Sequence, residues 1–233
     1  MATTSTVLMS GRDALLIDPA WMPDELDALA AALSQRDLHV IGGFATHAHQ
    51  DHLLWHPAFG DAPRWASRRT AELARSERAS LVEYLGPDFP SALKDLMGQV
   101  KGVEVMPENA TSAAFTPELV IHDGHAPGHT ALWLAKQRVL IAGDMLSDVE
   151  LPLPFYPDDL PSYFEALDVL AGYARQAEVV IPGHGAPGRD PLERVDADRR
   201  FLDAVVRGVK PNDRRLKNPG MQEALEHLRE MVA

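Results

Sequence analysis

The apolar residues near the start of the chain predict two strands, a helix and a third strand, in that order. Two short aliphatic runs flank Gly11-Arg12-Asp13, a sequence typical of a hairpin turn. From Pro23 onward, apolar residues recur every three or four positions, which predicts an amphipathic helix. The next apolar run ends directly before Thr46 and is typical of a buried strand. The predicted strands are Thr6–Ser10, Ala14–Asp18 and His39–Ala45.

The stretch from about residue 57 to residue 112 has a different character. A short strand is expected at Pro63–Ala66, followed by a helix over Ser67–Leu85 that stops at Gly86-Pro87. Phe89–Val100 favours a second helix. Because this stretch separates two halves that alternate between strands and helices, we interpret it as a helical insertion or lid. The chain is then a single domain of residues 1–233.

Strand-like and helix-like patterns resume after the insertion and continue to the end of the chain. Helical periodicity is clearest at Met221–Val232, where one apolar stripe favours core packing. The alternation of strands and helices predicts a mixed α/β (α+β) fold class. The further predicted strands are Leu119–Ile121, Ala131–Ala135, Val139–Ala142 and Val179–Ile181, and the further predicted helices are Ser162–Ala174, Pro191–Val209 and Met221–Val232.

Composition narrows the classes of function. The formal net charge of −12 disfavours binding to nucleic acid. Because the chain has no cysteine, any metal must be held by imidazole and carboxylate groups. Met1–Arg12 lacks the pattern of a secretion signal, and no apolar run approaches the ~20 residues that span a bilayer. We therefore expect a soluble, cytoplasmic protein with no membrane partner.

The segment His47–His52, with the sequence HAHQDH, has the strongest chemical signal in the chain. On an extended backbone, His47 and His49 point the same way, so both imidazoles can bind one ion. If the chain turns after His49, Asp51 and His52 project towards a neighbouring position. The spacing therefore predicts the start of a site for two adjacent metal ions.

Two ions need more ligands than this segment offers, so further histidines and carboxylates are expected downstream. His129, Asp144 and His184 fit this expectation. A glycine directly precedes each of them, which allows the backbone to pass close to a crowded centre. The same local design at three distant places favours a metal site over ordinary turn chemistry.

With these elements in order, the sequence resembles the metallo-β-lactamase superfamily from Leu15–Pro19 to His184-Gly185. The resemblance implies a four-layer αββα sandwich with the metal site at one edge of its two sheets. It also implies two divalent ions, zinc in the first place and iron or manganese as alternatives. The implied ligands are His47, His49 and His129 for one ion, Asp51, His52 and His184 for the other, and Asp144 as the bridge.

The implied activity is hydrolysis of an ester, thioester or lactone of a small molecule by a metal-bridging hydroxide, which Asp51 would help to orient. Asp144 is similar to the bridging aspartate of the thioesterase and lactonase branches, rather than to the cysteine or serine of the secreted β-lactamases. Two alternatives remain open: a mononuclear iron oxygenase of the persulfide dioxygenase type, and a non-catalytic metal-binding relative. The oligomeric state cannot be inferred from the sequence.

Several other residues of the chain have a structural role as an alternative to a functional one. Trp55 is expected in the core rather than at the site entrance. Asp18 is either a turn residue or a group that orients a ligand. Leu151–Pro157 is either a pocket wall or a stiff surface connection. The histidines expected to be surface groups or hydrogen-bonded partners are His39, His56, His122, His125 and His227.

Overall fold

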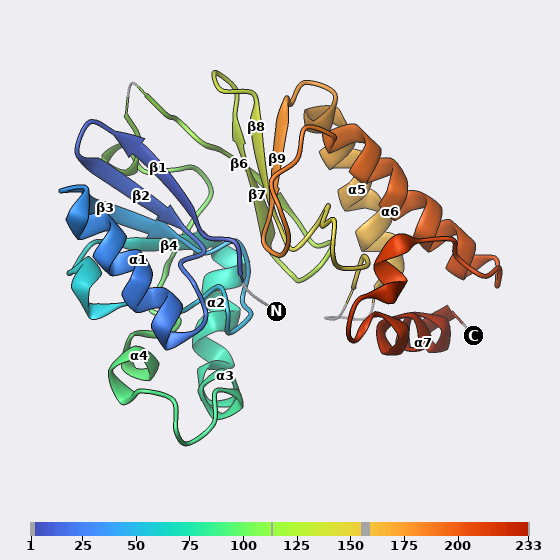
Figure 1. The fold of residues 1–233 in the computed structure, drawn as a ribbon, viewed down its shortest axis with the longest axis horizontal. Helices are drawn as coiled ribbons and strands as arrows, with labels where there is room; N and C mark the ends of the chain where they lie inside the picture. The colour runs from blue at the N-terminus through green and yellow to red at the C-terminus, as the bar shows by residue number, and fades with distance from the viewer. Residues whose placement is uncertain (1–2, 113, 155–158, 233) are drawn as a thin grey trace.

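Two β-sheets face each other at the centre of the computed structural model, which describes residues 3–112, 114–154 and 159–232 (Figure 1). In the first sheet the strands run antiparallel between β1 and β2 and parallel from β2 to β5. In the second sheet β6, β7 and β8 are antiparallel, and β9 lies parallel to β8. The first sheet consists of β1 (Thr6–Ser10), β2 (Asp13–Ile17), β3 (His39–Phe44), β4 (Arg64–Ser67) and β5 (Lys101–Val103), and the second of β6 (Glu118–His122), β7 (His129–Leu134), β8 (Val139–Gly143) and β9 (Val179–Pro182).

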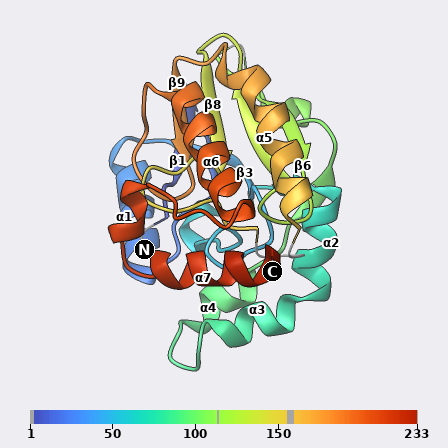
Figure 2. The same ribbon diagram turned by 90° about the vertical axis from the view of Figure 1, so that its right-hand side faces the viewer.

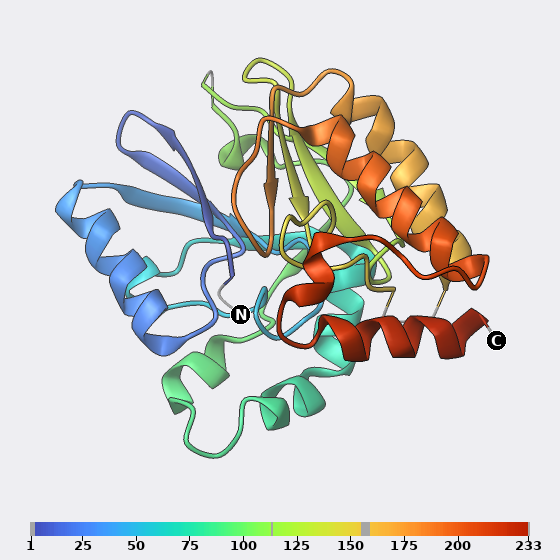
Figure 3. The ribbon, with the colours of Figure 1, turned by 45° about the vertical axis from the view of Figure 1, so that its right-hand side comes forward.

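Helices cover the outer faces of both sheets. Helices α1 to α4 pack on the side of the first sheet, and α5 and α6 cover the second sheet (Figure 1). Helix α7 crosses one end of the molecule beyond α5 and α6 (Figures 2 and 3). None of the helices in the described part of the chain is long and apolar enough to cross a bilayer. The helices are α1 (Pro23–Gln35), α2 (Arg68–Ser76), α3 (Arg78–Tyr84), α4 (Ser91–Leu96), α5 (Leu160–Ala174), α6 (Pro191–Val206) and α7 (Met221–Val232).

Alternation along the strands separates three apolar layers. In β7, Leu132 and Leu134 face the core between the two sheets, whereas Ala131 and Trp133 face the core beneath α5 and α6. The same alternation in β2 directs Leu15 between the sheets and its neighbours towards α1. Each large aliphatic side chain buried in this way contributes about 1.5–3 kcal/mol. The expected four-layer αββα sandwich is confirmed.

The stretch at about 57–112 contributes more to the fold than the sequence pattern indicates. It adds β4 and β5 to the first sheet, in addition to α2, α3 and α4. The helix expected over Ser67–Leu85 is interrupted at Glu77, which separates α2 from α3. The Arg78 side chain donates hydrogen bonds to carbonyls at the end of α4, so a tertiary contact accompanies the break. Whether this stretch acts as a lid stays a prediction.

Two glycines in β3 make room for tryptophans that lie directly against the backbone. A Cβ at Gly43 would overlap the Trp55 ring, and a Cβ at Gly42 would overlap the Trp65 ring. Trp55 is 2% exposed, which confirms its expected place in the core. Because β3 leads into the HAHQDH segment, this packing also fixes the start of the candidate site.

We predict that Gly43→Ala lowers the free energy of unfolding by about 1–3 kcal/mol, because the added methyl group overpacks the contact with Trp55. The matched control is Gly172→Ala in α5, where a Cβ would meet no neighbouring atom. The Gly172→Ala change should raise the free energy of unfolding by about 0.5–1 kcal/mol, because alanine stabilises a helix more than glycine does. Urea denaturation measures the free energy of unfolding of both variants. A Gly43→Ala variant as stable as the native protein would contradict the close contact between Gly43 and Trp55.

Candidate metal centre

Four strand ends bring the chemically important side chains to one edge of the two sheets. The HAHQDH segment follows β3, His125 follows β6, Asp144 follows β8 and His184 follows β9. Their ligand atoms form two groups, in each of which all atoms lie within 4.8 Å of one another. The first group is His47, His49, His125 and Asp144, and the second is Asp51, His52, Asp144 and His184.

The first group consists of three imidazoles and one carboxylate. His47 Nε2 lies 2.9 Å from His49 Nδ1, and His125 Nε2 lies 3.2 Å from the same nitrogen. The Oδ2 atom of Asp144 is 3.5 Å from His47 Nε2 and 3.6 Å from His125 Nε2. Three ring nitrogens and one oxygen therefore converge on a single point, as the ligands of a divalent ion do.

The second group consists of two imidazoles and two carboxylates. Asp51 Oδ2 lies 3.3 Å from His52 Nε2 and 3.1 Å from His184 Nε2. Asp144 closes the group, with Oδ1 3.2 Å from His52 Nε2 and Oδ2 3.3 Å from His184 Nε2. Asp144 thus belongs to both groups and joins them.

The donor atoms of these groups fit metal ions better than they fit one another. His52 Nε2 and Asp144 Oδ1 are both buried and lie 3.2 Å apart as an ion pair, yet neither makes a hydrogen bond of good geometry within the described residues. A buried polar atom without a well-formed hydrogen bond costs about 1–3 kcal/mol, so this arrangement is unfavourable unless a cation binds both atoms. The side chains in both groups are imidazole and carboxylate, the ligands that suit zinc, iron and manganese.

Electrostatics within the centre favour a bound cation. Burial acts to raise the pKa of Asp144, but the neighbouring imidazoles, of which His52 is the strongest, lower it well below its ordinary value. The pKa of Asp51 is lowered in the same way, with His52 again the largest opposing influence to burial. Burial lowers the pKa of His47 well below its ordinary value and that of His125 to about 3. Burial also acts to lower the pKa of His52 and His184, but neighbouring carboxylates raise it, well above the ordinary value for His52 and to about 11 for His184. The imidazoles of the first group are therefore neutral, the form that binds metal, whereas in the second group a metal ion would take the place of the protons that the two histidines hold against the carboxylates.

Neighbouring groups orient the histidines. The backbone N–H and the hydroxyl of Thr46 donate to Asp18, at 2.8 Å and 2.7 Å, and Asp18 Oδ2 lies 3.0 Å from His52 Nδ1. Asp18 therefore directs Nε2 of His52 towards the carboxylates, which supports an orienting role for Asp18. On the other side, His125 Nδ1 donates to the Leu153 carbonyl oxygen at 2.8 Å, so its Nε2 faces the first group.

His129 lies beside the two groups rather than in them. It is the first residue of β7, fully buried, and its ring stacks on His122 at 4.8 Å. Its Nε2 accepts a hydrogen bond from the backbone N–H of Asp144 at 3.1 Å. Burial lowers the pKa of His129 well below its ordinary value, so the ring is neutral and can accept this bond. The structure therefore places His125 where the sequence interpretation placed His129, and gives His129 a part in holding Asp144.

The signal that separates these two histidines is their position relative to the strands. A glycine precedes both, since Gly124 stands before His125 as Gly128 stands before His129, so that criterion could not choose between them. The other site segments follow the carboxyl end of a strand, and His125 follows β6 in the same way. His129 begins the next strand, where its side chain is committed to sheet packing.

A cavity of about 460 Å³ opens onto the centre. Its inner wall includes His49, Asp51 and Asp144, and Leu153 adds an apolar surface. The start of Leu151–Pro157, up to residue 154, is buried, which supports a pocket wall rather than a surface connection. The rest of that segment lies outside the described residues. On the outer side, α7 contributes Met221, Glu223, Ala224 and His227.

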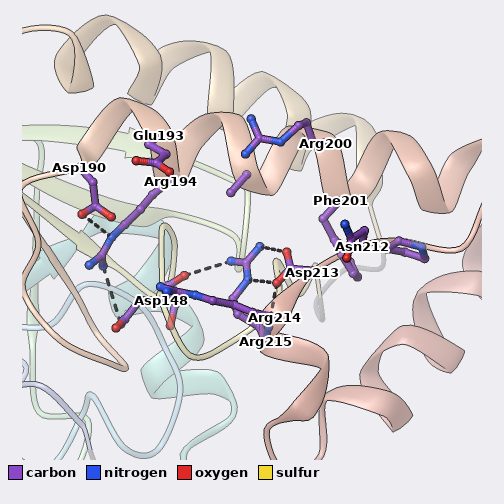
Figure 4. Close-up of a pocket in the computed structure, with 13 residues that line it drawn as sticks. Asp148, Asp190, Glu193, Arg194, Arg200, Phe201, Asn212, Asp213, Arg214 and Arg215 are labelled. Atoms are coloured by element: carbon purple, nitrogen blue, oxygen red, sulfur yellow. Dashed lines mark hydrogen bonds and ion pairs between the residues drawn. The ribbon is translucent and has the colours of Figure 1, made fainter.

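Two buried arginines brace the loops that follow Asp144 and His184 (Figure 4). Arg215 donates to the carbonyl oxygens of Ser147 at 3.0 Å and of Glu150 at 2.9 Å, and pairs with Asp198 at 2.6 Å. Arg194 donates to the carbonyl oxygens of Leu146 at 3.2 Å and of Ala186 at 3.1 Å, which ties the two loops together. Sequence patterns do not reveal this bracing, because Arg215 lies 68 residues from Ser147 and Arg194 lies 48 residues from Leu146.

We predict that Arg215→Met lowers the free energy of unfolding by about 3–5 kcal/mol, because it leaves the buried carboxylate of Asp198 without its partner. The double variant Arg215→Met/Asp198→Asn should recover part of this loss. The control is Arg68→Met, since Arg68 pairs with Glu104 at the surface and such pairs contribute about 1 kcal/mol or less. Equal losses of unfolding free energy in Arg68→Met and Arg215→Met would show that the buried contacts of Arg215 stabilise the fold no more than a surface ion pair does.

Comparisons with known proteins agree with this fold. The metallo-beta-lactamase superfamily profile matches residues 1–184. The probable metallo-hydrolase YflN of Bacillus subtilis (strain 168) is 28% identical over 206 residues, covering 74% of this chain and 75% of YflN. The metallo-beta-lactamase family protein TTHA1429 from Thermus thermophilus shares the fold, with a TM-score of 0.68 and 20% identity over 98% of this chain and 86% of that chain.

A second solved structure, TTHA1623 in a di-iron-bound form, has a TM-score of 0.63 and 23% identity, and covers 81% of this chain and 90% of that chain. The profile match extends over most of the chain and ends at His184, the last histidine of the second group. The expected family is therefore confirmed. The chain belongs to the metallo-beta-lactamase superfamily.

Proposed function

We propose that this protein is a hydrolase that uses two divalent cations to cleave an ester, thioester or lactone of a small molecule. One observation supports this most directly: two complete groups of ligand atoms share the carboxylate of Asp144. Membership of a superfamily of metal-dependent hydrolases supports the same general chemistry.

The ligands follow from the geometry of the two groups. We assign His47, His49 and His125 to one ion, and Asp51, His52 and His184 to the other, with Asp144 between them. When bound, the ions supply Lewis acidity, which lowers the pKa of a water molecule and polarises a substrate carbonyl. Zinc, iron and manganese all suit these ligands.

The remaining chemistry belongs to the side chains of the cavity. Asp51 lines the cavity and is an ionised carboxylate, so it can accept a hydrogen bond from water and orient the attacking oxygen. Leu153 and Met221 narrow the cavity with apolar surface and favour a partly apolar substrate. Among its described lining residues there is no serine, threonine or lysine, and the chain has no cysteine. Direct attack by water is therefore favoured over a covalent intermediate.

The second group of ligands also bears on the oxygenase alternative. A mononuclear iron oxygenase needs one metal ion, so the Asp51, His52 and His184 side chains would have no ligand role. TTHA1623 was solved in a di-iron-bound form, so bound iron does not by itself indicate a single-metal centre in this fold. Two ions per chain with hydrolysis support the proposal, whereas a single ferrous ion with oxygen uptake supports the oxygenase.

We expect His49→Ala to lower kcat/KM for hydrolysis by more than about a hundredfold, the loss that removing even a supporting group of a metal site can cause. A chelator should abolish activity in the native protein, and added zinc, manganese or iron should restore it. A panel of esters, thioesters and lactones provides the assay. The exposed His39 supplies the control, since His39→Ala should keep full activity. Full activity in His49→Ala would refute the proposal.

The assignment of His125 rather than His129 is tested separately by metal content. His125→Ala should hold about one ion per chain after dialysis, because the first group loses a nitrogen. His129→Gln should hold two, because the glutamine oxygen can accept the hydrogen bond from the Asp144 backbone. Elemental analysis of both variants gives the answer, and the reverse pattern would restore the sequence-based assignment.

A further inference from the structure

The mouth of the cavity above the candidate metal centre is acidic. Beyond the ligands themselves, Glu150 and Glu223 both line it. No lysine or arginine is among the lining residues that the structure describes. The two carboxylates come from different elements, since Glu150 lies in the loop after Asp144 and Glu223 lies in the first turn of α7.

Glu150 is held close to the centre. It is half-buried, and its backbone N–H donates to Ser147 Oγ at 2.9 Å while its carbonyl oxygen accepts from Arg215 at 2.9 Å. These bonds fix the backbone that presents its side chain to the cavity. The guanidinium of Arg215 does not neutralise the mouth, because it pairs with the carboxylates of Asp198 and Asp213. Figure 4 shows the pair with Asp213.

The mouth adds negative charge to that of the ligands. The ligands Asp51 and Asp144 already bring two carboxylates to the two divalent cations, and Glu150 and Glu223 bring two more to the cavity. On entering the mouth, an anionic substrate would lose its contacts with water, meet the two like charges of Glu150 and Glu223, and find no lysine or arginine among the described lining residues. Like charges close together lower binding affinity, so the two carboxylates act mainly by excluding anionic substrates.

The rest of the lining suits an uncharged acyl chain. Leu153 is 7% exposed and Met221 is 4% exposed, and with Ala224 they form an apolar patch beside the two carboxylates. Met221 is fixed in place, because its sulfur accepts a hydrogen bond from the Leu151 backbone at 3.2 Å.

We propose that Glu150 and Glu223 determine specificity by charge: the site takes esters, thioesters or lactones whose acyl group is uncharged or cationic and partly apolar, and it rejects acyl groups that bear a carboxylate. This inference rests on the proposed hydrolytic function. It excludes substrates whose acyl group bears a carboxylate, such as the monothioesters of dicarboxylic acids.

The test uses the metal-loaded protein and phenyl thioesters of three acids of matched chain length: hexanoic acid, adipic acid linked through one carboxyl, and 5-(trimethylammonio)pentanoic acid. Rates are corrected for the chemical hydrolysis of each thioester. We expect kcat/KM for the adipoyl compound to be at least about tenfold below that for the other two at low salt. Raising the salt concentration should narrow this gap, because salt screens charges but not steric contacts.

The double variant Glu150→Gln/Glu223→Gln should bring the adipoyl and hexanoyl compounds to within about threefold of each other. The control is Glu226→Gln, an exposed residue of α7 outside the cavity, which should leave the discrimination unchanged. A native protein that prefers the adipoyl compound, or a double variant that discriminates as strongly as the native protein, would overturn the proposal.

Ketone analogues, in which a methylene group replaces the thioester sulfur, separate this inference from the proposed function. They cannot be hydrolysed, so calorimetry measures their binding whether or not the protein turns over thioesters. The hexanoyl analogue should bind at least about tenfold more tightly than the adipoyl analogue. If the hexanoyl analogue binds more tightly but no thioester is hydrolysed, the proposed hydrolase function is refuted and the selection by charge stands. Equal or reversed affinities of the two analogues would refute the selection by charge.

Discussion

The shared carboxylate of Asp144 is the contact on which the centre depends. It lies within 3.6 Å of histidine nitrogens in both groups, and those histidines come from segments that are far apart in the sequence. Burying this many imidazole and carboxylate groups together is unfavourable, because they lose their contacts with water. Bound cations would offset that loss. The fold must therefore hold Asp144 firmly, and it does so from two sides, through the His129 ring beneath its backbone and through the braced loop that follows it.

The four layers have a direct consequence for this centre. Each site segment follows a strand whose side chains are packed on both faces, so the strand ends are fixed relative to one another. Glycine allows the close approach of the segments: a Cβ at Gly143 would overlap the His129 ring, and a Cβ at Gly183 would overlap Asp144. Arg194 and Arg215 hold the loops that follow Asp144 and His184, while α7 forms part of the cavity wall. The packed strands and the braced loops thus position the ligands, and α7 contributes to the lining of the cavity.

Local patterns predicted most of the strands, the family and six of the seven residues that the two groups contain, because alternation and the HAHQDH spacing depend on neighbouring residues. The choice between His125 and His129 was beyond such patterns, since both follow glycine and only the start of β7 separates them. The break at Glu77, the strand β5 and the placement of α7 over the cavity all depend on contacts between distant segments. Sequence spacing does not encode these contacts.

Anomalous diffraction from crystals of the metal-loaded protein, recorded at the absorption edge of the added metal, tests the arrangement of the centre most directly. Two separate peaks should appear, one within the group of His47, His49 and His125 and the other within that of Asp51, His52 and His184, with Asp144 between them. A single peak, a peak coordinated by His129, or no peak in metal-saturated crystals would contradict a two-metal centre joined by Asp144.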